Sequence, residues 1–416
     1  MTVPARVRAL DAELRAFTQL LDDAPRQEAA TGPLATWPVA VKDNIDVAGT
    51  PRTDGLRGPH QVAAADAEVV RRLRAAGARI VAKANLEELS FAATTQNPTY
   101  GACRNPWDTD RIPGGSSGGS AVAVAAGLVR LAIGTDTGGS LRNPAAFCGV
   151  TTIRPSHGLV PTLGVTPLSP SMDVVGPIAR SAEDVLAALE VLAGWPVIPE
   201  AAADLSALRV GVPEEYFLDD LEPAVARGFE DMLDVLRDAG AAVRPVRGLR
   251  AVHRVHAAMA ALQNSEAVRH LYPFWEDPRV SEGIRGRIDA GRAVTVREAE
   301  RALAVAQRWR ADVGTTLAEV DLVAVPATPF VAPRADAGDL TETSRRINRL
   351  TGCWSLTGLP VVSLPVTPSD SGLPVGVQLV GAAGRDRAVL GAAVGLQAMT
   401  DWHTARPPVA LENPWD

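Results

Sequence analysis

The chain has 416 residues, of which 46% are hydrophobic and 21% charged, and its net charge is −7. This composition can bury a large core, and the negative balance offers no basic face for a nucleic acid. The three cysteines, Cys103, Cys148 and Cys353, are unpaired by count and lack CxxC spacing, so they indicate a reducing compartment and offer no zinc site.

The first 23 residues are charged, with apolar residues at helical spacing. This pattern predicts a helix and differs from that of a signal peptide. The longest apolar stretch, AVAVAAGLVRLAI, is interrupted by Gly127 and Arg130 and is too short to span a bilayer. We therefore expect no membrane partner and a cytoplasmic location.

Lysine is almost absent from the chain, which makes its two lysines informative. Only Lys42 and Lys83 occur among 41 basic residues. Arginine cannot lose its proton at accessible pH, whereas burial can make lysine neutral, so a site that needs an amine base must keep lysine. Lys42 ends the apolar segment WPVAVK before a turn signal, which predicts a lysine at the end of a buried strand. A structural lysine paired with Asp43 or Asp46 is the alternative.

Two serines 24 residues apart each lie in a glycine-rich bend. Ser116 is in GGSSGGS, and Ser140 ends GTDTGGS. Glycine allows backbone conformations closed to other residues, so such a bend can direct several N–H donors at one developing negative charge. The first bend alone is equally typical of a linker, but the second follows an apolar run that a linker would not contain. The pair predicts a nucleophile with an oxyanion site.

Short apolar runs alternate with helical periods in the rest of the chain. Residues 225–243 have helix spacing, and the segments SALRVGVP and DLVAVPATP are typical of buried strands. Residues 251–310 are rich in Ala, Arg and Glu and predict a helical excursion. We expect this excursion to form a wall or lid over the site, or else a solvated helical layer.

Several longer segments, taken with these features, resemble the amidase signature family. They are AKANLEELSFAATTQNPTYGACRNPWDTDRIPGG, LRNPAAFCGV, PLSPSMDVVGPIARS and LTGLPVVSLPVTPSDSGLPVGVQLVG. The resemblance implies an α/β fold in which residues 1–416 form one large domain, with a central mixed β-sheet covered by helices on both sides. The implied catalytic core is residues 32–192 and 321–402, with a helical excursion at 205–310.

The resemblance also implies a Ser–Ser–Lys triad whose linking serine follows a cis peptide bond. At the matching positions the nucleophile is Ser140, the bridging serine is Ser116 and the base is Lys42. A proton would pass from Ser140 through Ser116 to neutral Lys42 during attack on the amide carbonyl, and water would then cleave the acyl-enzyme. No metal or organic cofactor is implied. The implied oxyanion hole consists of the backbone N–H groups of Thr137, Gly138, Gly139 and Ser140.

The first bend also fits another serine hydrolase motif. Residues 114–118 match G-x-S-x-G, the nucleophile elbow of hydrolases whose base is histidine. The chain has only six histidines, and the late ones lie in helical or terminal segments rather than in loops after strands. His403, in DWHTARPP, is the best late candidate for a histidine base, but a surface histidine explains it as well.

Three polar residues at family positions are expected to support the Ser140 turn. Asp136 and Arg142 flank this turn and would hold it by hydrogen bonds, and Asp173, in SPSMDVVGP, fits the same supporting role. Contact of Arg142 with a substrate carboxylate is the lesser alternative.

The pocket residues are less clearly marked in the sequence. Phe91 and Ala92 match positions that line the acyl pocket of the family, and Met172 is expected beside them, although Phe91 fits a core position equally well. Lys83, in ARIVAKANLEEL, is expected to end a strand and to help place the Lys42 segment.

The implied activity is hydrolysis of linear C–N amide bonds, by an enzyme acting on a small-molecule carboxamide. The products would be a carboxylate and ammonia or an amine. The alternative is an amidotransferase A-type subunit that releases ammonia from glutamine for a partner subunit. Two lysines and a charge of −7 give no evident basic face for a tRNA-bound assembly, so the sequence disfavours this alternative and no nucleic-acid partner is expected. A homodimer or a small partner subunit is compatible with the chain.

Overall fold

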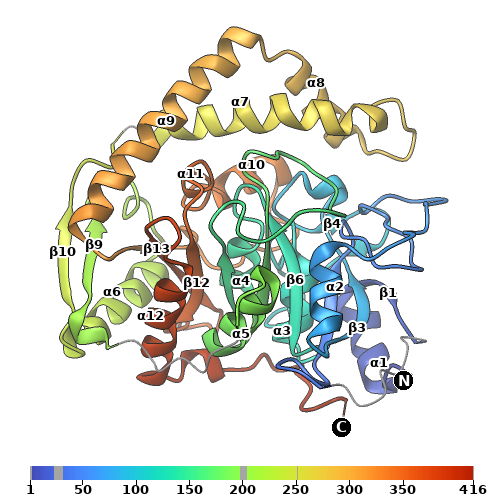
Figure 1. The fold of residues 1–416 in the computed structure, drawn as a ribbon, viewed down its shortest axis with the longest axis horizontal. Coiled ribbons are helices and arrows are strands. Elements are labelled where there is room, and N and C mark those ends of the chain that lie inside the picture. Colours follow the sequence, from blue (N-terminus) through green and yellow to red (C-terminus); the bar gives the residue numbers. More distant parts are fainter. Residues whose placement is uncertain (1, 23–30, 197–203, 251, 416) are drawn as a thin grey trace.

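A large mixed β-sheet organises the computed structural model, which describes residues 2–22, 31–196, 204–250 and 252–415 (Figure 1). In this part of the chain the sheet has eleven strands, in the order β1-β3-β2-β6-β8-β7-β12-β13-β11-β9-β10, and β4 and β5 form a separate pair. The strands are β1 (Phe17–Leu20), β2 (Pro38–Lys42), β3 (Arg79–Ala84), β4 (Gln96–Asn97), β5 (Gly101–Ala102), β6 (Leu131–Asp136), β7 (Thr151–Arg154), β8 (Val174–Ala179), β9 (Arg209–Pro213), β10 (Ala242–Val246), β11 (Leu322–Pro326), β12 (Val361–Val366) and β13 (Val375–Gly381).

Parallel and antiparallel pairs both occur in the sheet. Strand β2 runs parallel to β3 and β6, whereas β6 pairs antiparallel with β8 and β12 with β13. The helices are α1 (Ala5–Leu14), α2 (Glu68–Ala75), α3 (Gly118–Ala125), α4 (Arg142–Cys148), α5 (Ala182–Ala193), α6 (Pro223–Asp238), α7 (Val252–Leu271), α8 (Glu282–Arg292), α9 (Val296–Glu319), α10 (Leu340–Ile347), α11 (Gly352–Ser355) and α12 (Asp386–Ala398).

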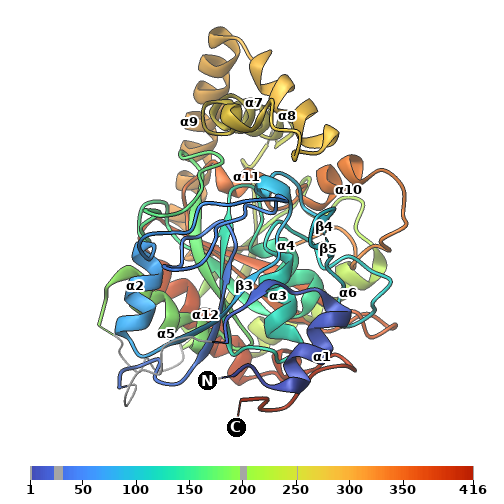
Figure 2. The same cartoon turned by 90° about the vertical axis from the view of Figure 1, so that its right-hand side faces the viewer.

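Helices cover both faces of the sheet. One hydrophobic cluster joins α2, α5 and α12 to the strands, and a second joins α1, α3 and α4 to them. Figure 2 shows these two groups of helices on opposite sides of the sheet. Central strands β6, β8, β12 and β13 are buried at every residue, which explains their continuous apolar sequences. The predicted α/β fold with a mixed, doubly covered sheet is confirmed.

The helices α7, α8 and α9 form a separate tier at one end of the molecule, and both chain ends lie at the opposite end (Figures 1 and 2). Helix α9 begins with a capping box, in which Thr295 and Glu298 exchange side-chain and backbone hydrogen bonds. Hydrogen bonds and a hydrophobic cluster tie α7 to the body. The Glu266 carboxylate accepts a hydrogen bond from Ser169 Oγ at 2.8 Å, and a ring nitrogen of His256 lies 2.8 Å from the Arg349 carbonyl.

Among the described residues, the helices are either too short or too polar to cross a bilayer. The long helices α7 and α9 carry charged residues along their length.

Candidate active site

Two neighbouring parallel strands bring the candidate residues to one edge of the sheet. Val41 of β2 pairs with Ile133 of β6, so Lys42 at the end of β2 lies level with the end of β6 and the turn that follows it. The Lys42 side chain is fully buried, as expected from the apolar segment that precedes it. Its Nζ lies 2.8 Å from the Oγ1 of Thr135, a β6 residue.

The first glycine-rich bend lies against the second. Ser117 Oγ donates a hydrogen bond to the Thr135 carbonyl at 3.0 Å, and the Ser117 N–H donates to the Ser140 carbonyl at 3.2 Å. The Gly115–Ser116 peptide bond is cis, as the family resemblance implies. These contacts place Ser116 Oγ 2.7 Å from Lys42 Nζ. The structure therefore brings Lys42, Ser116 and the Ser140 turn together.

Burial controls the protonation of Lys42. It lowers the pKa of Lys42 to about 7, against the weaker opposing effect of nearby carboxylates such as Asp136 and Asp173. The pairing with Asp43 or Asp46 does not occur, because Asp43 binds Lys83 at 2.6 Å and Asp46 binds Arg52 at 2.9 Å. Lys42 can therefore be neutral near pH 7.

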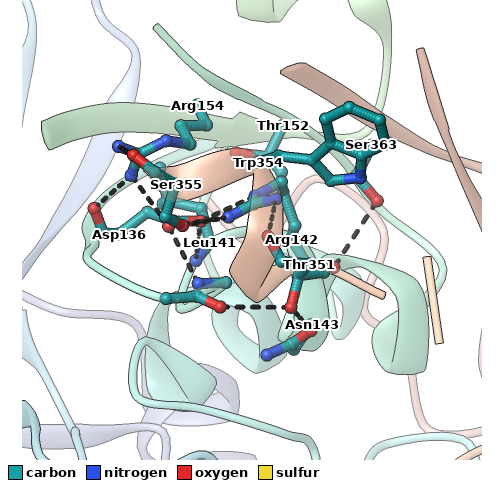
Figure 3. Close-up of polar contacts among 12 residues, drawn as sticks. Asp136, Leu141, Arg142, Asn143, Thr152, Arg154, Thr351, Trp354, Ser355 and Ser363 are labelled. Carbon is teal, nitrogen blue, oxygen red and sulfur yellow. Dashed lines mark hydrogen bonds and ion pairs between the residues drawn. The ribbon is translucent and has the colours of Figure 1, made fainter. Parts of the chain in front are cut away.

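A buried ionic network holds the Ser140 turn (Figure 3). The Asp136 carboxylate accepts hydrogen bonds from Arg142 and Arg154 at 3.0 Å each, and also from the N–H groups of Gly139 and Leu141 at 2.9 and 3.2 Å. Burial alone would raise the pKa of Asp136, but the two guanidinium charges outweigh it and hold that pKa below its usual value. Asp136 therefore fixes the turn as a carboxylate.

The remaining donors of Arg142 are also used inside the protein. They contact the Thr351 carbonyl at 2.8 Å and Ser355 Oγ at 3.0 Å (Figure 3). A further donor contacts Gln378 Oε1 at 2.9 Å. Since these contacts and Asp136 engage its guanidinium, the arrangement favours the supporting interpretation of Arg142 over contact with substrate. Asp173 takes a similar part, since its carboxylate accepts from Thr137 Oγ1 at 2.6 Å.

The turn leaves three backbone donors free. In the described part of the chain, the N–H groups of Thr137, Gly138 and Ser140 have no hydrogen-bond acceptor, whereas the N–H of Gly139 is engaged by Asp136. Gly139 has φ +134°, and a Cβ there would lie 2.3 Å from Thr351 Oγ1, so only glycine fits. The turn can therefore offer three N–H groups to an oxyanion, one fewer than the resemblance implies.

A cavity of about 870 Å³ lies between the helical tier and the body of the protein, and we call it the main cavity. Its lining does not include residues 137–140 of the turn. Phe91 lines this cavity, together with Met259, Gln263 and Arg287 from the helical tier. A Cβ on Gly138 would lie 3.4 Å from Met259 Cε and 3.7 Å from Gln263 Oε1, so α7 passes over the turn. The expectation of a wall over the site agrees with this position of α7.

Two of the predicted pocket residues are placed differently from Phe91. Met172 is 1% exposed and packs with Phe217 and Trp354 in a hydrophobic cluster, outside the lining of the main cavity. Ala92 is half-buried and is likewise absent from that lining. The sequence alone could not show which of Phe91, Ala92 and Met172 lines the cavity, because all three side chains are apolar.

The histidine alternative finds no support in the geometry. His403 lies in the C-terminal segment, where the Ala405 carbonyl accepts from Arg180 at 2.7 Å. Arg180 directly follows β8, whereas the other end of β8, at Val174, pairs with Asp136 of the site. The length of the strand, about 16 Å, therefore separates the His403 region from the Ser140 turn.

Residues from the helical tier were not predicted individually. Gln263 and Arg287 are polar side chains in Ala- and Arg-rich helices, where nothing local distinguishes them from solvated residues. Thr135 was also missed, although its place in GTDTGGS beside a buried strand was a usable signal. Among the described residues, no group of three or more His, Cys, Asp or Glu side chains could hold a metal ion.

Comparisons with known proteins agree with this fold. A family model described as Amidase matches residues 4–390. The A subunit of glutamyl-tRNA(Gln) amidotransferase from Roseiflexus sp. (strain RS-1) is 34% identical, over 98% of this chain and 94% of that protein. These matches define an amide-hydrolysing class of enzyme. The chain belongs to the amidase signature family.

Solved structures support the same class. A crystal structure of an amidase has a TM-score of 0.86 at 36% identity, covering 94% of this chain and 93% of that one. The structure of 6-aminohexanoate cyclic dimer hydrolase complexed with substrate has a TM-score of 0.87 at 27% identity, covering 97% and 94%. This protein is therefore an amide hydrolase.

Proposed function

We propose that the protein hydrolyses a small carboxamide through Ser140, Ser116 and Lys42. The observation that carries this proposal is the 2.7 Å contact between Lys42 Nζ and Ser116 Oγ, made by a lysine whose pKa burial lowers to about 7. Neutral Lys42 accepts the Ser116 proton while Ser116 accepts that of Ser140, whose Oγ bonds to the amide carbon. The C–N bond then breaks, and the relay returns a proton to the leaving nitrogen.

The free N–H groups of the turn would stabilise the oxyanion of this step. Thr137, Gly138 and Ser140 offer them within four consecutive residues, and the buried Asp136 network holds their positions before substrate arrives. Donors fixed in advance need no reorganisation as charge develops on the carbonyl oxygen. Water completes the cycle by attacking the acyl carbon and releasing Ser140.

The lining of the main cavity favours a substrate whose acyl group carries a carboxylate. Arg287 lines this cavity and is half-buried, with its guanidinium 5.5 Å from the Phe91 ring centre. Among the described residues it has no hydrogen bond and no carboxylate within ion-pair distance, and burial lowers its pKa. Glu87 and Asp339 act on this guanidinium only at longer range. A substrate carboxylate would supply the direct ion pair that the half-buried Arg287 lacks.

The relatives favour glutamine as the amide. Glutamine is a small carboxamide with a carboxylate, and proteins named as the A subunit of glutamyl-tRNA(Gln) amidotransferase align with almost the whole chain. They support the amidotransferase A-type role, which the charge of the chain alone disfavours. A partner subunit can provide the basic face that this chain lacks. The free-standing amidase is the second candidate, and the 36% identity to a solved amidase supports it.

Ammonia release from matched amides tests this proposal. Glutaramate and pentanamide have equally long carbon chains, and only the first carries a carboxylate. We expect glutaramate and glutamine to exceed pentanamide in kcat/KM by about 100-fold, as for a charge-assisted contact of about 2–3 kcal/mol, and Arg287→Ala to remove most of that preference. Equal rates for both amides, unchanged by Arg287→Ala, would show that the acyl group needs no carboxylate.

The two candidate roles differ in what the single chain can do. An amidotransferase subunit should hydrolyse glutamine weakly alone and faster when co-expressed with the other subunits of its complex. A free-standing amidase should reach its full rate as a single chain. Rates measured with and without those subunits, with Ser140→Ala as the blank, separate the two roles.

A further inference from the structure

A second cavity reaches the Ser140 turn, where Thr135 and Thr137 line it. Its volume is about 450 Å³, and we call it the second cavity. Its polar lining next to the turn consists of Asn44, Ser90, Thr135, Thr137 and Asp173, and His157, Thr162, Thr166 and His270 also line the cavity. The apolar part is formed by Val160, Pro161, Val165, Pro167, Leu168, Pro170, Val174 and Val175.

Hydrogen bonds connect the second cavity to the proton relay. Asn44 Nδ2 donates to Thr135 Oγ1 at 3.3 Å, Thr135 Oγ1 lies 2.8 Å from Lys42 Nζ, and Lys42 Nζ lies 2.7 Å from Ser116 Oγ. Thr137, which lines the same cavity, also carries one of the free N–H groups of the turn. A molecule in the polar part of this cavity therefore lies beside the relay and the oxyanion site.

The polar part holds a buried acceptor without a partner. Asn44 is 3% exposed, and its Oδ1 has no hydrogen-bond partner in the described structure. The buried Oγ of Ser90 lacks a partner as well. The Asp173 carboxylate also lines this cavity, where it accepts hydrogen bonds from Thr137 Oγ1 and from the N–H groups of Leu168 and Ser169. Leaving a buried acceptor unpaired is destabilising, so a bound N–H donor would be stabilised at this position.

The two cavities differ in the chemistry that they offer. Ser90 lines the second cavity and the next residue, Phe91, lines the main cavity, so the chain between them forms part of the dividing wall. The main cavity presents the Arg287 guanidinium, which attracts an anion. The second cavity presents Asn44 Oδ1 and the Asp173 carboxylate, which attract N–H donors. An acyl-transfer enzyme needs two subsites of this kind, one for each side of the scissile bond.

We propose that the second cavity is the leaving-group subsite, which binds the amine side of the amide by its N–H groups. This assignment rests on the proposed function, because it places the scissile carbonyl at Ser140. The ligand class is ammonia or a primary amine with a small apolar substituent, which would lie against Val160, Val165 and Pro167. Water that later attacks the acyl-enzyme enters the position that the amine leaves.

The reverse step gives this subsite a direct assay. An added amine in the second cavity attacks the acyl carbon through its nitrogen, the bond between that carbon and Ser140 Oγ breaks, and one amine proton returns to Ser140 through the relay. Hydroxylamine in place of ammonia gives a hydroxamate, whereas water gives the acid. The ratio of hydroxamate to acid depends only on the acyl-enzyme, not on how fast it forms.

The first test measures this ratio with glutaramate as the acyl donor and hydroxylamine as the acceptor. Asn44→Leu removes the acceptor oxygen, and we expect the ratio to fall about tenfold, as for the loss of one hydrogen bond. Asn44→Asp keeps an acceptor oxygen and should stay within about threefold of the wild-type ratio. A ratio unchanged in Asn44→Leu would overturn the assignment of this subsite.

The second test changes the apolar part and needs no change near the relay. Val165→Phe narrows the second cavity, so kcat/KM for the N-butyl amide of glutarate should fall about tenfold relative to glutaramate, whose leaving group is ammonia. Leu163, on the same loop, is 77% exposed and outside the cavity lining, so Leu163→Phe is the matched control and should leave that selectivity unchanged. If Val165→Phe instead alters acyl-chain preference, the two cavities have been assigned the wrong way round.

These outcomes separate the inference from the function on which it rests. If neither acid nor hydroxamate forms above the Ser140→Ala blank with any of these amides, the proposed function is wrong and the subsite assignment falls with it. Both products can also form while Asn44→Leu leaves the hydroxamate-to-acid ratio unchanged and Val165→Phe leaves the leaving-group selectivity unchanged. In that case the proposed function stands and only the subsite assignment is wrong.

Discussion

Lys42 Nζ lies 2.7 Å from Ser116 Oγ, at a place where both side chains are almost completely buried. The other hydrogen-bond partner of Lys42 in the described structure is also a hydroxyl, that of Thr135. No carboxylate in that structure is paired with it, so burial dominates and its pKa falls to about 7. This relationship distinguishes Lys42 from Lys83, which is equally buried but paired with Asp43.

The difference between the two lysines predicts opposite responses to arginine. Lys42→Arg keeps a positive charge but removes the neutral base, so kcat/KM should fall by at least about 100-fold, nearly as far as in Lys42→Ala. Lys83→Arg keeps a cation opposite Asp43 and should retain far more activity. The comparison is valid only if both variants are folded, which a melting temperature close to that of the wild type shows. Near-normal turnover by Lys42→Arg would make Lys42 a charge partner and the proposed relay wrong.

Labelling by a fluorophosphonate separates the roles of the two serines. Ser140→Ala should lose both turnover and labelling while the fold is retained, because Ser140 ends the turn and places its hydroxyl beside the free N–H groups. Ser116→Ala should retain a slow labelling of Ser140, read by mass spectrometry of the modified peptide. Labelling that persists in Ser140→Ala but disappears in Ser116→Ala would reverse the assignment.

The pH dependence follows from the sign of the Lys42 shift. Burial lowers the pKa of Lys42, and the neutral form is the active one, so kcat/KM for glutaramate should rise with pH through about 7 and level off above it. The carboxylates of Asp136, Asp173 and Glu87 oppose the shift, so removal of one of these charges should move the rise to lower pH.

A histidine base would give a similar midpoint, so His403→Ala is the necessary companion to this pH profile. Because His403 lies far from the Ser140 turn, His403→Ala should leave both the pH profile and kcat/KM unchanged. Loss of activity in His403→Ala would instead favour a histidine base.

The Asp136 network predicts a large effect on stability. Asp136→Asn leaves Arg142 and Arg154 buried opposite a neutral group, and the free energy of unfolding should fall by about 3–5 kcal/mol. Asp370→Asn is the control, because Asp370 is 91% exposed in its pair with Arg227 and should change stability by less than about 1 kcal/mol. Urea denaturation of both variants provides the comparison. Equal stability losses would show that the network does not hold the turn.

The sequence contained most of the information about the sheet edge. Lys42 could be placed at the end of a buried strand because the residues before it are mostly apolar, and the glycine-rich turn could be recognised because its backbone geometry depends on local residues. The family resemblance extended these local patterns to the α/β fold and the cis bond before Ser116. The exact set of free N–H groups could not be predicted, because it depends on which donor the Asp136 carboxylate engages.

By itself, the sequence marked Ser116, Ser140 and Lys42 by local patterns in a chain with only two lysines, and the family resemblance implied which role each of them takes. Only the tertiary structure decided what surrounds them. Gln263 lines the main cavity because α7 passes over the turn, and Arg287 of α8 lines the same cavity. Met172 lies outside it because this residue packs beside Trp354. Such positions depend on contacts between residues far apart in the chain, and apolar or charged residue types alone do not specify them.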